Sequence, residues 1–478
     1  MSGTVSAMQS RIETVRERLE AIGQEHLLRF ADELAPEQLD ALLTQIESLD
    51  LDAVPTLVRD YVESKPSFDP GAATITPPPG YMRDGSWDID RYRTAGEELL
   101  RAGKIAAFTV AGGQGSRLGY DGPKGCYPGG AVTGQPLFAC LADWIHAAQD
   151  RYGATVPWYI MTSPLNHDAT VEFFKNHDHF GLDAANIAFF NQGVLPSFDM
   201  NSGKILLAQK HEVATNPDGH GGSLRALAHS GALADMKRRG IEHISYVQID
   251  NPIARVVDPV FIGLHATAPD SSGEMSTKVV AKTEPGEKVG VVCCIDGKPG
   301  VIEYSDLPEA TAAQRNPDGT LTLRAGNIAL HMLSRAFVER ITSGDLELPY
   351  HRAEKKVPCV DPESGHPIDP TEPNGIKLEM FVFDAIPLCK QSIVYEVERT
   401  DEFAPIKNAE GNDSPASSAH LQTERAAAWL EARGVTVPRK PDGSPDCVLE
   451  ISPRTAMRPE ELDPETIRSL QPGEKRAI

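Results

Sequence analysis

The stretch AFTVAGGQGSRLGYDGPKGCYP, residues 107–128, decides the fold of this chain. Its first residues complete a short apolar strand, KIAAFTV, and glycines follow at once. Glycine lets backbone N–H groups approach a ligand closely and take positive φ angles. A strand that leads through such a loop into a helix forms a concave anion site. Because Arg117 and Lys124 lie in the loop, we expect it to bind a phosphate chain.

Two familiar phosphate motifs do not match this loop. The dinucleotide fingerprint G-x-G-x-x-G would need a glycine where the chain has Leu118. The P-loop needs G-K-[ST], and the chain reads PKG around Lys124. A nicotinamide-dependent oxidoreductase is therefore an alternative function, but Leu118 and the PKG segment argue against it.

Outward from the loop, short apolar runs alternate with helical patterns. VPWYIMTS and HISYVQID read as further strands, and a helix is expected to begin near Asn166. This alternation predicts an α/β fold with a mostly parallel sheet. The segment 278–304 has β-branched runs separated by Gly and Pro, which indicates antiparallel hairpins, expected to form an added sheet.

The ends of the chain read differently from its centre. Apolar residues recur at helical spacing within 9–32, and Pro36 suits the first turn of a second helix. Residues 67–87 are rich in Pro and Gly and predict an irregular connection. We therefore expect an N-terminal helical segment and connection over 1–95, a central domain over 96–400 and a small lobe over 401–478. The polar last ten residues are expected to be frayed.

Composition limits the function. The 478 residues are 40% hydrophobic and 24% charged, and the net charge of −22 argues against binding to nucleic acid or to a membrane. No run is long enough to cross a membrane. The seven cysteines show no CxxC pair, which favours the cytoplasm over an oxidising compartment. No signal-peptide pattern is seen, and no protein partner is implied.

The glycine loop, read as G-x-G-[ST]-R-L-G followed by P-K-G, resembles the signature of the nucleotidyltransferases that make nucleotide sugars. More narrowly, the chain resembles the eukaryotic-type UDP-N-acetylglucosamine pyrophosphorylases of the UDP-glucose pyrophosphorylase superfamily. The resemblance covers about residues 95–455, and its segments stand in the family's order. They are VPWYIMTS, NQGVLPSFD, NPDGHGGSLRAL, QIDNP, VGVVC, IEYSD, AGNIALH, NGIKLEMFVFD, YEVERTDEFAPIKNA and EISP.

The resemblance implies a Rossmann-like nucleotidyltransferase (GT-A-like) fold with a mixed central sheet, an N-terminal helical segment and a small C-terminal α+β lobe. It also implies that a sugar 1-phosphate attacks the α-phosphorus of UTP and that pyrophosphate leaves. This chemistry needs alignment and charge neutralisation rather than a covalent nucleophile. The absence of a G-x-S-x-G elbow from the sequence agrees with this expectation.

Nucleotide and catalytic roles follow from the same resemblance. Arg117 is expected at the β- and γ-phosphates, Lys124 at the α-phosphate and Lys407 at the phosphates, with Lys377 as a further phosphate contact. A glutamine amide can both donate and accept, so it can distinguish uracil from cytosine. The nucleotide-binding residues implied are Gly112, Gly113, Gln192 and Gly219.

For the metal, the resemblance implies Mg²⁺ on Asp250, at the end of an apolar strand, where ligands gather in open α/β sheets. Mg²⁺ keeps water and phosphate oxygens as its other ligands, so one protein carboxylate suffices. The sugar-contacting residues implied are His220, Gly290, Glu303, Asn327, Phe381 and Phe383.

Three departures from the family pattern bear on the sugar. His220 stands where the family reads asparagine in P-D-G-N-G-G, and histidine changes the shape of the site and can titrate. Leu330 replaces a small polar residue, and Ser116 replaces the frequent threonine. We expect UDP-N-acetylglucosamine or UDP-N-acetylgalactosamine as product. The alternatives are a glucose 1-phosphate or broad-specificity pyrophosphorylase and, in a third class, a catalytically silent nucleotide-sugar sensor.

Overall fold

By its internal contacts, the chain in this computed structural model separates into two compact units. The structure describes residues 2–65, 73–344, 348–467 and 469–478. The first unit combines Met1–Phe68, Gly193–Gly222 and Leu348–Val382. The second combines Asp69–Gln192, Ser223–Glu347 and Phe383–Ile478. Each unit is thus assembled from segments distant in sequence, and the division into 1–95, 96–400 and 401–478 stays a prediction.

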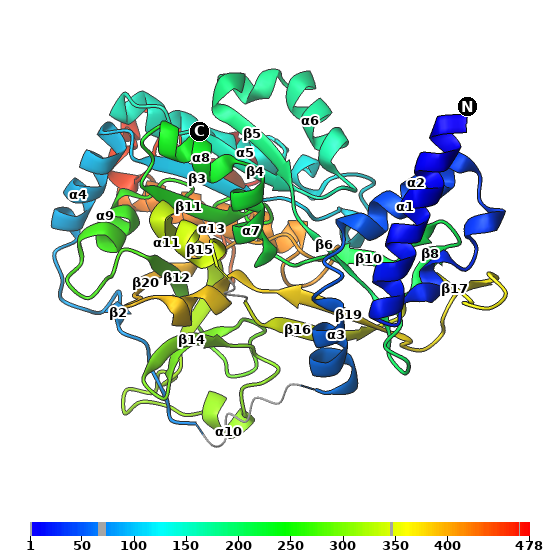
Figure 1. The fold of residues 1–478 in the computed structure, drawn as a ribbon. Helices are drawn as coiled ribbons and strands as arrows, with labels where there is room; N and C mark the ends of the chain where they lie inside the picture. Colours follow the sequence, from blue (N-terminus) through cyan, green and yellow to red (C-terminus); the bar gives the residue numbers. More distant parts are fainter. Residues whose placement is uncertain (1, 66–72, 345–347, 468) are drawn as a thin grey trace. The chain divides into compact units, whose positions relative to one another are not determined.

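The second unit is built on a mixed sheet, to which the described residues contribute eleven strands (Figure 1). Eight follow the order β2-β20-β12-β15-β11-β3-β4-β5, and β13 joins β1 and β14 to β15. β3, β4, β5 and β11 are parallel, whereas β15 is antiparallel to β11 and β12. The predicted mixed α/β sheet is therefore confirmed. The strands are β1 (Ile75–Thr76), β2 (Gly80–Tyr81), β3 (Ile105–Val110), β4 (Trp158–Thr162), β5 (Ile187–Asn191), β11 (His243–Gln248), β12 (Met275–Ala281), β13 (Val291–Ile295), β14 (Lys298–Ile302), β15 (Ala325–Ser334) and β20 (Val394–Val397).

These strands are apolar because helices cover both faces of the sheet. All residues of β4 and the first five of β3 are buried. α4 (Ile89–Arg101), α5 (Leu137–Tyr152) and α9 (Pro259–Thr267) share one apolar cluster with the strands. α8 (Ala232–Arg238) and α11 (Arg335–Thr342) contact each other and lie in front of the sheet in Figure 1. The parallel strands end at one edge, where their loops meet.

α4 and α9 pack so closely that their backbones touch. A Cβ atom on Gly96 would lie 1.8 Å from the carbonyl oxygen of Pro259, and one on Gly263 would lie 1.8 Å from that of Tyr92. Glycine is the residue that permits such an approach. The contact fixes the start of α9 against the middle of α4.

The predicted hairpin in 278–304 is confirmed as β13 and β14, joined at Asp296 and Gly297, which both have positive φ. It extends the main sheet through the pairing of Val291 with Gly326, so the expected added sheet does not form. The register of β12 and β15 shifts between Lys278 and Val279, and the β15 strand bulges there.

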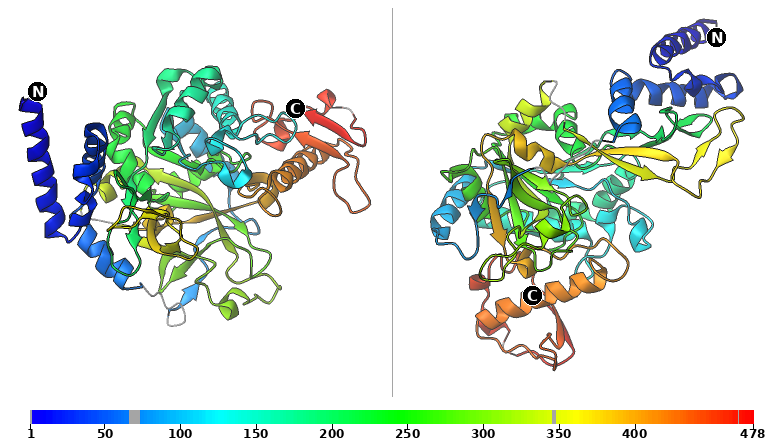
Figure 2. Two further views of the ribbon diagram at one scale, coloured as in Figure 1. Left: turned by 90° about the vertical axis from the view of Figure 1, so that its right-hand side faces the viewer. Right: turned by 90° about the horizontal axis from the view of Figure 1, so that it is seen from below.

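The C-terminal segment forms a lobe of the second unit with its own apolar cluster. In Figure 2, α13 (Pro415–Ala432) lies beside β21 (Cys447–Glu450) and β22 (Glu474–Ala477), which pair in parallel. The expectation that the last ten residues are frayed is wrong, because β22 completes this two-stranded sheet. Further helices of the unit are α6 (His167–Asn176), α7 (Gly222–His229, whose first residue is counted with the first unit), α10 (Glu309–Ala312) and α12 (Arg399–Glu402), with short 3₁₀ turns at Asp178–Gly181, Ala184–Asn186, Val382–Leu388, Pro459–Glu461 and Pro464–Thr466.

The first unit packs N-terminal helices on small sheets. α2 (Pro36–Ser48) begins at Pro36 as predicted and buries Leu42, Leu43 and Ile46. α1 (Ser2–Ala21) is shorter than the helical spacing over 9–32 predicts, because Gly23 takes a positive φ and 3₁₀ turns follow. The other elements are α3 (Val54–Leu57), a π-helical turn (Val58–Glu63), β6 (Val194–Pro196), β7 (Phe198–Asp199), β8 (Leu207–Gln209), β9 (Glu212–Val213), β10 (Thr215–Pro217), β16 (Tyr350–Lys355), β17 (Cys359–Val360), β18 (Pro367–Ile368) and β19 (Gly375–Met380).

The connection predicted over 67–87 lies partly outside the described residues; its described part contains the short strands β1 and β2. Among the helices of the described residues, none has the length and apolar character that a membrane span requires.

Candidate active site

The glycine loop leaves the carboxyl end of β3 and closes on itself. The N–H of Gly115 donates to the carbonyl of Gly122 (2.9 Å), and that of Lys124 donates to the carbonyl of Gly113 (3.1 Å). Gly119, at a φ of 68°, ends the 3₁₀ turn Ser116–Leu118, and Lys124 begins a second turn, Lys124–Cys126. The fold of the loop therefore holds Arg117 and Lys124 on two short turns of one closed structure.

Asn166 anchors this loop, and the sequence analysis did not assign it a role. Its side-chain amide donates to the carbonyls of Ala111 (3.0 Å) and Gly113 (3.1 Å) and accepts from the N–H of Ser163 (2.8 Å). Asn166 is 1% exposed, so these bonds are sheltered from water. The only local signal was a polar residue at a helix start, since the two carbonyl partners are more than fifty residues away.

Gln192 and Gly112 lie in contact at the same edge of the sheet. Gln192 directly follows β5, and its N–H donates to the carbonyl of Thr162 (2.8 Å). A Cβ on Gly112 would lie 2.1 Å from Oε1 of Gln192, so only glycine leaves space for this amide. A Cβ on Gly113 would meet no atom of the described residues within 4 Å. The backbone of Gly113 is thus approachable beside the amide of Gln192.

Lys124 and Asp250 form the centre of a charged cluster. Nζ of Lys124 lies 3.7 Å from Oδ2 of Asp250, and the two side chains are 16% and 14% exposed. Burial lowers the pKa of the Lys124 ammonium, and Lys407 and Arg117 lower it further, against the attraction of Asp250. The structure therefore pairs Lys124 with the predicted metal ligand and brings the predicted cations Arg117 and Lys407 near enough to lower the pKa of Lys124, while Lys407 also lies 4.0 Å from Oδ2 of Asp413.

Asn251 connects the strand end at Asp250 to the segment that carries Lys407. Its amide donates to the carbonyl of Glu402 (2.5 Å) and accepts from the N–H of Ala404 (3.2 Å). The N–H of Ile406 donates to the carbonyl of Asp250 (2.8 Å). Asn251 is 4% exposed, and sequence reasoning did not single it out.

Gly290, Glu303 and Asn327 lie together on the hairpin and β15. The N–H of Asn327 donates to the carbonyl of Gly290 (2.8 Å), and a Cβ on Gly290 would lie 3.0 Å from Oε1 of Glu303. The amide oxygen of Asn327 accepts from the N–H of Ala329, whose φ of 55° belongs to the β15 bulge. The bulge thus sets the direction of Asn327.

Leu330 and Phe383 are buried in the second unit. Leu330 is 3% exposed and belongs to the apolar cluster of the sheet. The leucine that stands here in place of the family's small polar residue therefore contributes to packing. Phe383 is 6% exposed, at the 3₁₀ turn that follows β19. Neither the Leu330 nor the Phe383 side chain carries a polar group that could hydrogen-bond a ligand.

In the first unit, the PDGHGG loop is bonded to the end of β19. The N–H of Gly221 donates to the carbonyl of Met380 (2.7 Å), and a Cβ on Gly219, at a φ of 84°, would lie 2.4 Å from that oxygen. The ring of His220 stacks on Phe381 with centroids 5.1 Å apart at 10°.

Hydrogen bonding orients the His220 ring. Its Nδ1 accepts from the N–H of Val382 at 3.1 Å, which assigns the proton of the neutral ring to Nε2. Lys377 lies on β19 in the same unit, paired with Ala353 across the strand. The predicted residues thus fall into two groups, Gly219, His220, Lys377 and Phe381 in the first unit and the others in the second.

The chain is similar to known proteins over most of its length. The human UDP-N-acetylhexosamine pyrophosphorylase-like protein 1 is 39% identical, over 94% of this chain and 94% of its own length. The UDP-N-acetylglucosamine pyrophosphorylase of Saccharomyces cerevisiae is 36% identical, over 87% and 90%. The crystal structure of the Trypanosoma brucei uridine diphosphate N-acetylglucosamine pyrophosphorylase in complex with inhibitor is 26% identical, with a TM-score of 0.79 over 95% of this chain and 94% of that one.

The family model described as UTP–glucose-1-phosphate uridylyltransferase matches residues 63–426, which include every predicted site residue. This match confirms the resemblance predicted from the glycine loop and the ordered segments. The chain belongs to the UTP–glucose-1-phosphate uridylyltransferase family.

Proposed function

We propose that this chain is a uridylyltransferase that makes UDP-N-acetylglucosamine, or UDP-N-acetylgalactosamine, from UTP and the sugar 1-phosphate. A phosphate oxygen of the sugar 1-phosphate attacks the α-phosphorus of UTP. The bond from that phosphorus to the bridging oxygen of the β-phosphate breaks, and pyrophosphate leaves. The observation that carries the proposal is the cluster of Lys124, Lys407 and Arg117 around Asp250, beside the Gly112–Gln192 contact.

Uracil recognition is assigned to Gln192 with the backbone of Gly112 and Gly113. The Gln192 amide offers both a donor and an acceptor to the uracil edge. Its 8% exposure and its contact with Gly112 restrict its rotamers. A preformed amide discriminates bases better than a mobile one, because less ordering is needed on binding.

Phosphate neutralisation is assigned to Arg117, Lys124 and Lys407. In the free enzyme, burial and then the charges of Lys407 and Arg117 lower the pKa of the Lys124 ammonium. A bound triphosphate relieves this repulsion, so binding and charge stabilisation are coupled. Lys124, on its fixed turn, would meet the negative charge that grows at the α-phosphate in the transition state.

A magnesium ion is assigned to Asp250. The described residues contain no group of three His, Cys, Asp or Glu side chains placed to hold a metal ion. A single carboxylate fits Mg²⁺, which binds nucleotides mainly through phosphate oxygens and water, and fits a structural zinc site poorly. Bound Mg²⁺ supplies additional neutralisation of phosphate charge.

For the sugar, we propose Glu303, Asn327 and the backbone of Gly290 as contacts of the hydroxyls, His220 as a contact of the sugar or its phosphate, and Phe381 and Phe383 as apolar contacts of the acetamido methyl group. Glu303 accepts hydrogen bonds from hydroxyls, and Asn327 both donates and accepts. Lys377 is kept as a phosphate contact, Gly219 as a nucleotide contact and the cytoplasm as the location, all as proposals.

A pyrophosphate-release assay across sugar 1-phosphates tests the substrate. We expect the highest kcat/KM with N-acetylglucosamine 1-phosphate or N-acetylgalactosamine 1-phosphate, and dependence on added Mg²⁺. A preference for glucose 1-phosphate would replace the acetamido product with UDP-glucose. Absence of pyrophosphate release with all of these sugars would reject the uridylyltransferase.

A further inference from the structure

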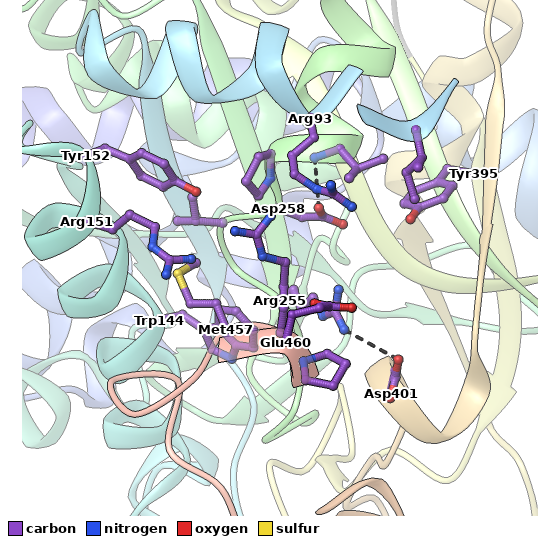
Figure 3. Close-up of a pocket in the computed structure, with 16 residues that line it drawn as sticks. Arg93, Trp144, Arg151, Tyr152, Arg255, Asp258, Tyr395, Asp401, Met457 and Glu460 are labelled. Carbon is purple, nitrogen blue, oxygen red and sulfur yellow. Dashed lines mark hydrogen bonds and ion pairs between the residues drawn. The ribbon is translucent and has the colours of Figure 1, made fainter. Parts of the chain in front are cut away.

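The second unit holds a cavity of about 190 Å³ that is lined by none of the residues assigned above; Figure 3 shows its lining. Arg93 reaches it from α4, Arg151 from α5 and Arg255 from the segment after β11, with Tyr152 and Tyr395 at opposite sides. Arg458 lines it as well. Four arginines around one cavity are notable in a chain with a net charge of −22.

Two of these guanidinium groups have unused donors. Arg255 is 17% exposed; its Nη2 lies 3.5 Å from Asp401, and its Nε, 3.7 Å from Glu402, has no hydrogen-bond partner among the described residues. Arg93 donates from Nη1 to Asp90, but its buried Nε also lacks a partner in the described part of the chain. Both Nε atoms are buried and do not face the cavity, whereas the accessible Nη1 of Arg255 and Nη2 of Arg93 have no hydrogen bond to the described residues and can donate to an oxyanion.

The acidic residues around the cavity are already engaged. Asp258 lies 2.5 Å from Nζ of Lys278 and accepts from the N–H of Val260 (3.0 Å). Asp401 accepts from Nε1 of Trp429 (2.9 Å), and Glu461 bonds both Arg151 and Arg458. Glu460 also lines the cavity, and because it is exposed, solvent screens its charge. The cationic donors, and not the carboxylates, are therefore the groups left to bind a ligand.

The size of the cavity admits a phosphate group. Its volume of about 190 Å³ is many times the roughly 10–15 Å³ that one water needs on a comparable measure. A neighbouring cavity of about 390 Å³ shares Ile89, Arg255, Tyr395 and Asp401 with it. A phosphate monoester could place its phosphate at the arginines and its organic part in this second cavity.

The cavity shares two chain segments with the catalytic cluster. Arg255 follows Asp250 by five residues, and Asp401 precedes Lys407 by six. Asn251 bonds these segments together between the two places, through Glu402 and Ala404. A ligand that draws Arg255 from Asp401 would thus act on both segments that position Asp250 and Lys407.

We propose that this cavity is an effector site for a phosphate group, free or as a monoester, held by Arg93 and Arg255 with Arg151 and Arg458 near. Binding at this site alters turnover through the two shared segments. The effect on turnover rests on the function proposed above, whereas the binding does not.

The test uses the Lys124→Ala variant, so that phosphate binding in the cavity is measured apart from phosphate binding at the catalytic site. Inorganic phosphate and glycerol 3-phosphate are each titrated at constant ionic strength, with protein stability against thermal unfolding as the binding signal. We expect saturable stabilisation that weakens at least about tenfold in affinity when Arg93→Gln is added, since a charged hydrogen bond is lost. The stronger of the two ligands identifies the source of the phosphate group.

Arg91→Gln is the matched control, since Arg91 is exposed on the same helix and does not line the cavity. It should leave phosphate affinity unchanged, and Arg93→Lys should recover part of it. Equal affinities in the Arg91 and Arg93 variants, or no saturable stabilisation, would overturn the site. The effect of phosphate on kcat and KM is then measured in the wild type and in Arg93→Gln. If phosphate binds but its effect on turnover is the same in both enzymes, the effector role is wrong.

Discussion

Lys124 and Lys278 belong to the same unit, yet their surroundings differ. Lys124 lies 3.7 Å from one carboxylate, with two further cations near, and keeps some exposure. Lys278 is 1% exposed and lies 2.5 Å from both Asp258 and Glu402. The first cation is left short of negative charge, which a substrate can supply, whereas the second is fully compensated by the fold. The number of carboxylates within reach thus distinguishes a binding cation from a structural one.

Removal of the structural cation should have the largest effect. Lys278→Met leaves Asp258 and Glu402 buried without their shared partner, and breaking such a pair costs about 3–5 kcal/mol. We expect a loss of that size in the free energy of unfolding, measured by denaturant titration. Lys282→Met, four residues further along the chain, is the control, since Nζ of Lys282 has only a 3.3 Å bond to the carbonyl of Pro285. Similar losses in both variants would contradict the comparison.

Removal of the binding cation should reduce catalysis by a comparable amount while sparing the fold. Lys124→Met should lower kcat/KM for UTP by about 10²–10³-fold, or about 2.7–4 kcal/mol of transition-state stabilisation. Its unfolding free energy at neutral pH should not fall, because the surroundings of Lys124 disfavour its charge. Lys104→Met, which removes a surface ion pair with Glu242, should keep full activity.

The pH dependence of protein stability tests the direction in which the pKa of Lys124 is shifted. Because the pKa of Lys124 is lowered in the folded state, the unfolded chain binds more protons at alkaline pH. Its contribution to stability should therefore rise as pH increases from the folded pKa to the usual lysine value. The difference in unfolding free energy between Lys124→Met and the wild type should shrink across that window. A difference that grows there would contradict the assigned direction.

The smallest expected effect concerns the loop backbone. Gly112→Ala places a methyl group 2.1 Å from Oε1 of Gln192, so the end of that side chain has to shift. We expect KM for UTP to rise about tenfold and discrimination against CTP to weaken, because Gln192 must move. Gly113→Ala is the matched comparison: its methyl group meets open space in the described structure, so the stability of the free protein should not change. Unchanged KM and base selectivity in Gly112→Ala would remove Gln192 from uracil recognition.

Much of the secondary structure of both units could be predicted from local patterns. The strand before the glycine loop, the helix after Asn166 and the helix at Pro36 follow from apolar periodicity and from proline and glycine positions. The family segments also grouped Gly290, Glu303 and Asn327, which the structure brings into contact.

What the sequence could not show depends on single contacts between distant segments. The side-chain amides of Asn166 and Asn251 form hydrogen bonds with residues up to 153 positions away, and no periodic pattern in the sequence marks such partners. The assembly of the first unit from three segments requires β7 to pair with β19, a register that neither strand encodes alone. The strand at the C-terminus was missed because its polar residues alternate across an exposed edge.

The interleaved first unit has a consequence for biosynthesis. Gln24 bonds the backbone around Ile205, and Arg29 donates to the carbonyl of Pro362, so the N-terminal helices need partners translated much later. About 280 residues separate Phe68 from Leu348. At roughly 5–20 residues per second, a ribosome needs on the order of 15–60 s to supply them. During that interval, the N-terminal segment around Arg29 lacks its final partner at Pro362 and is a natural client for chaperones.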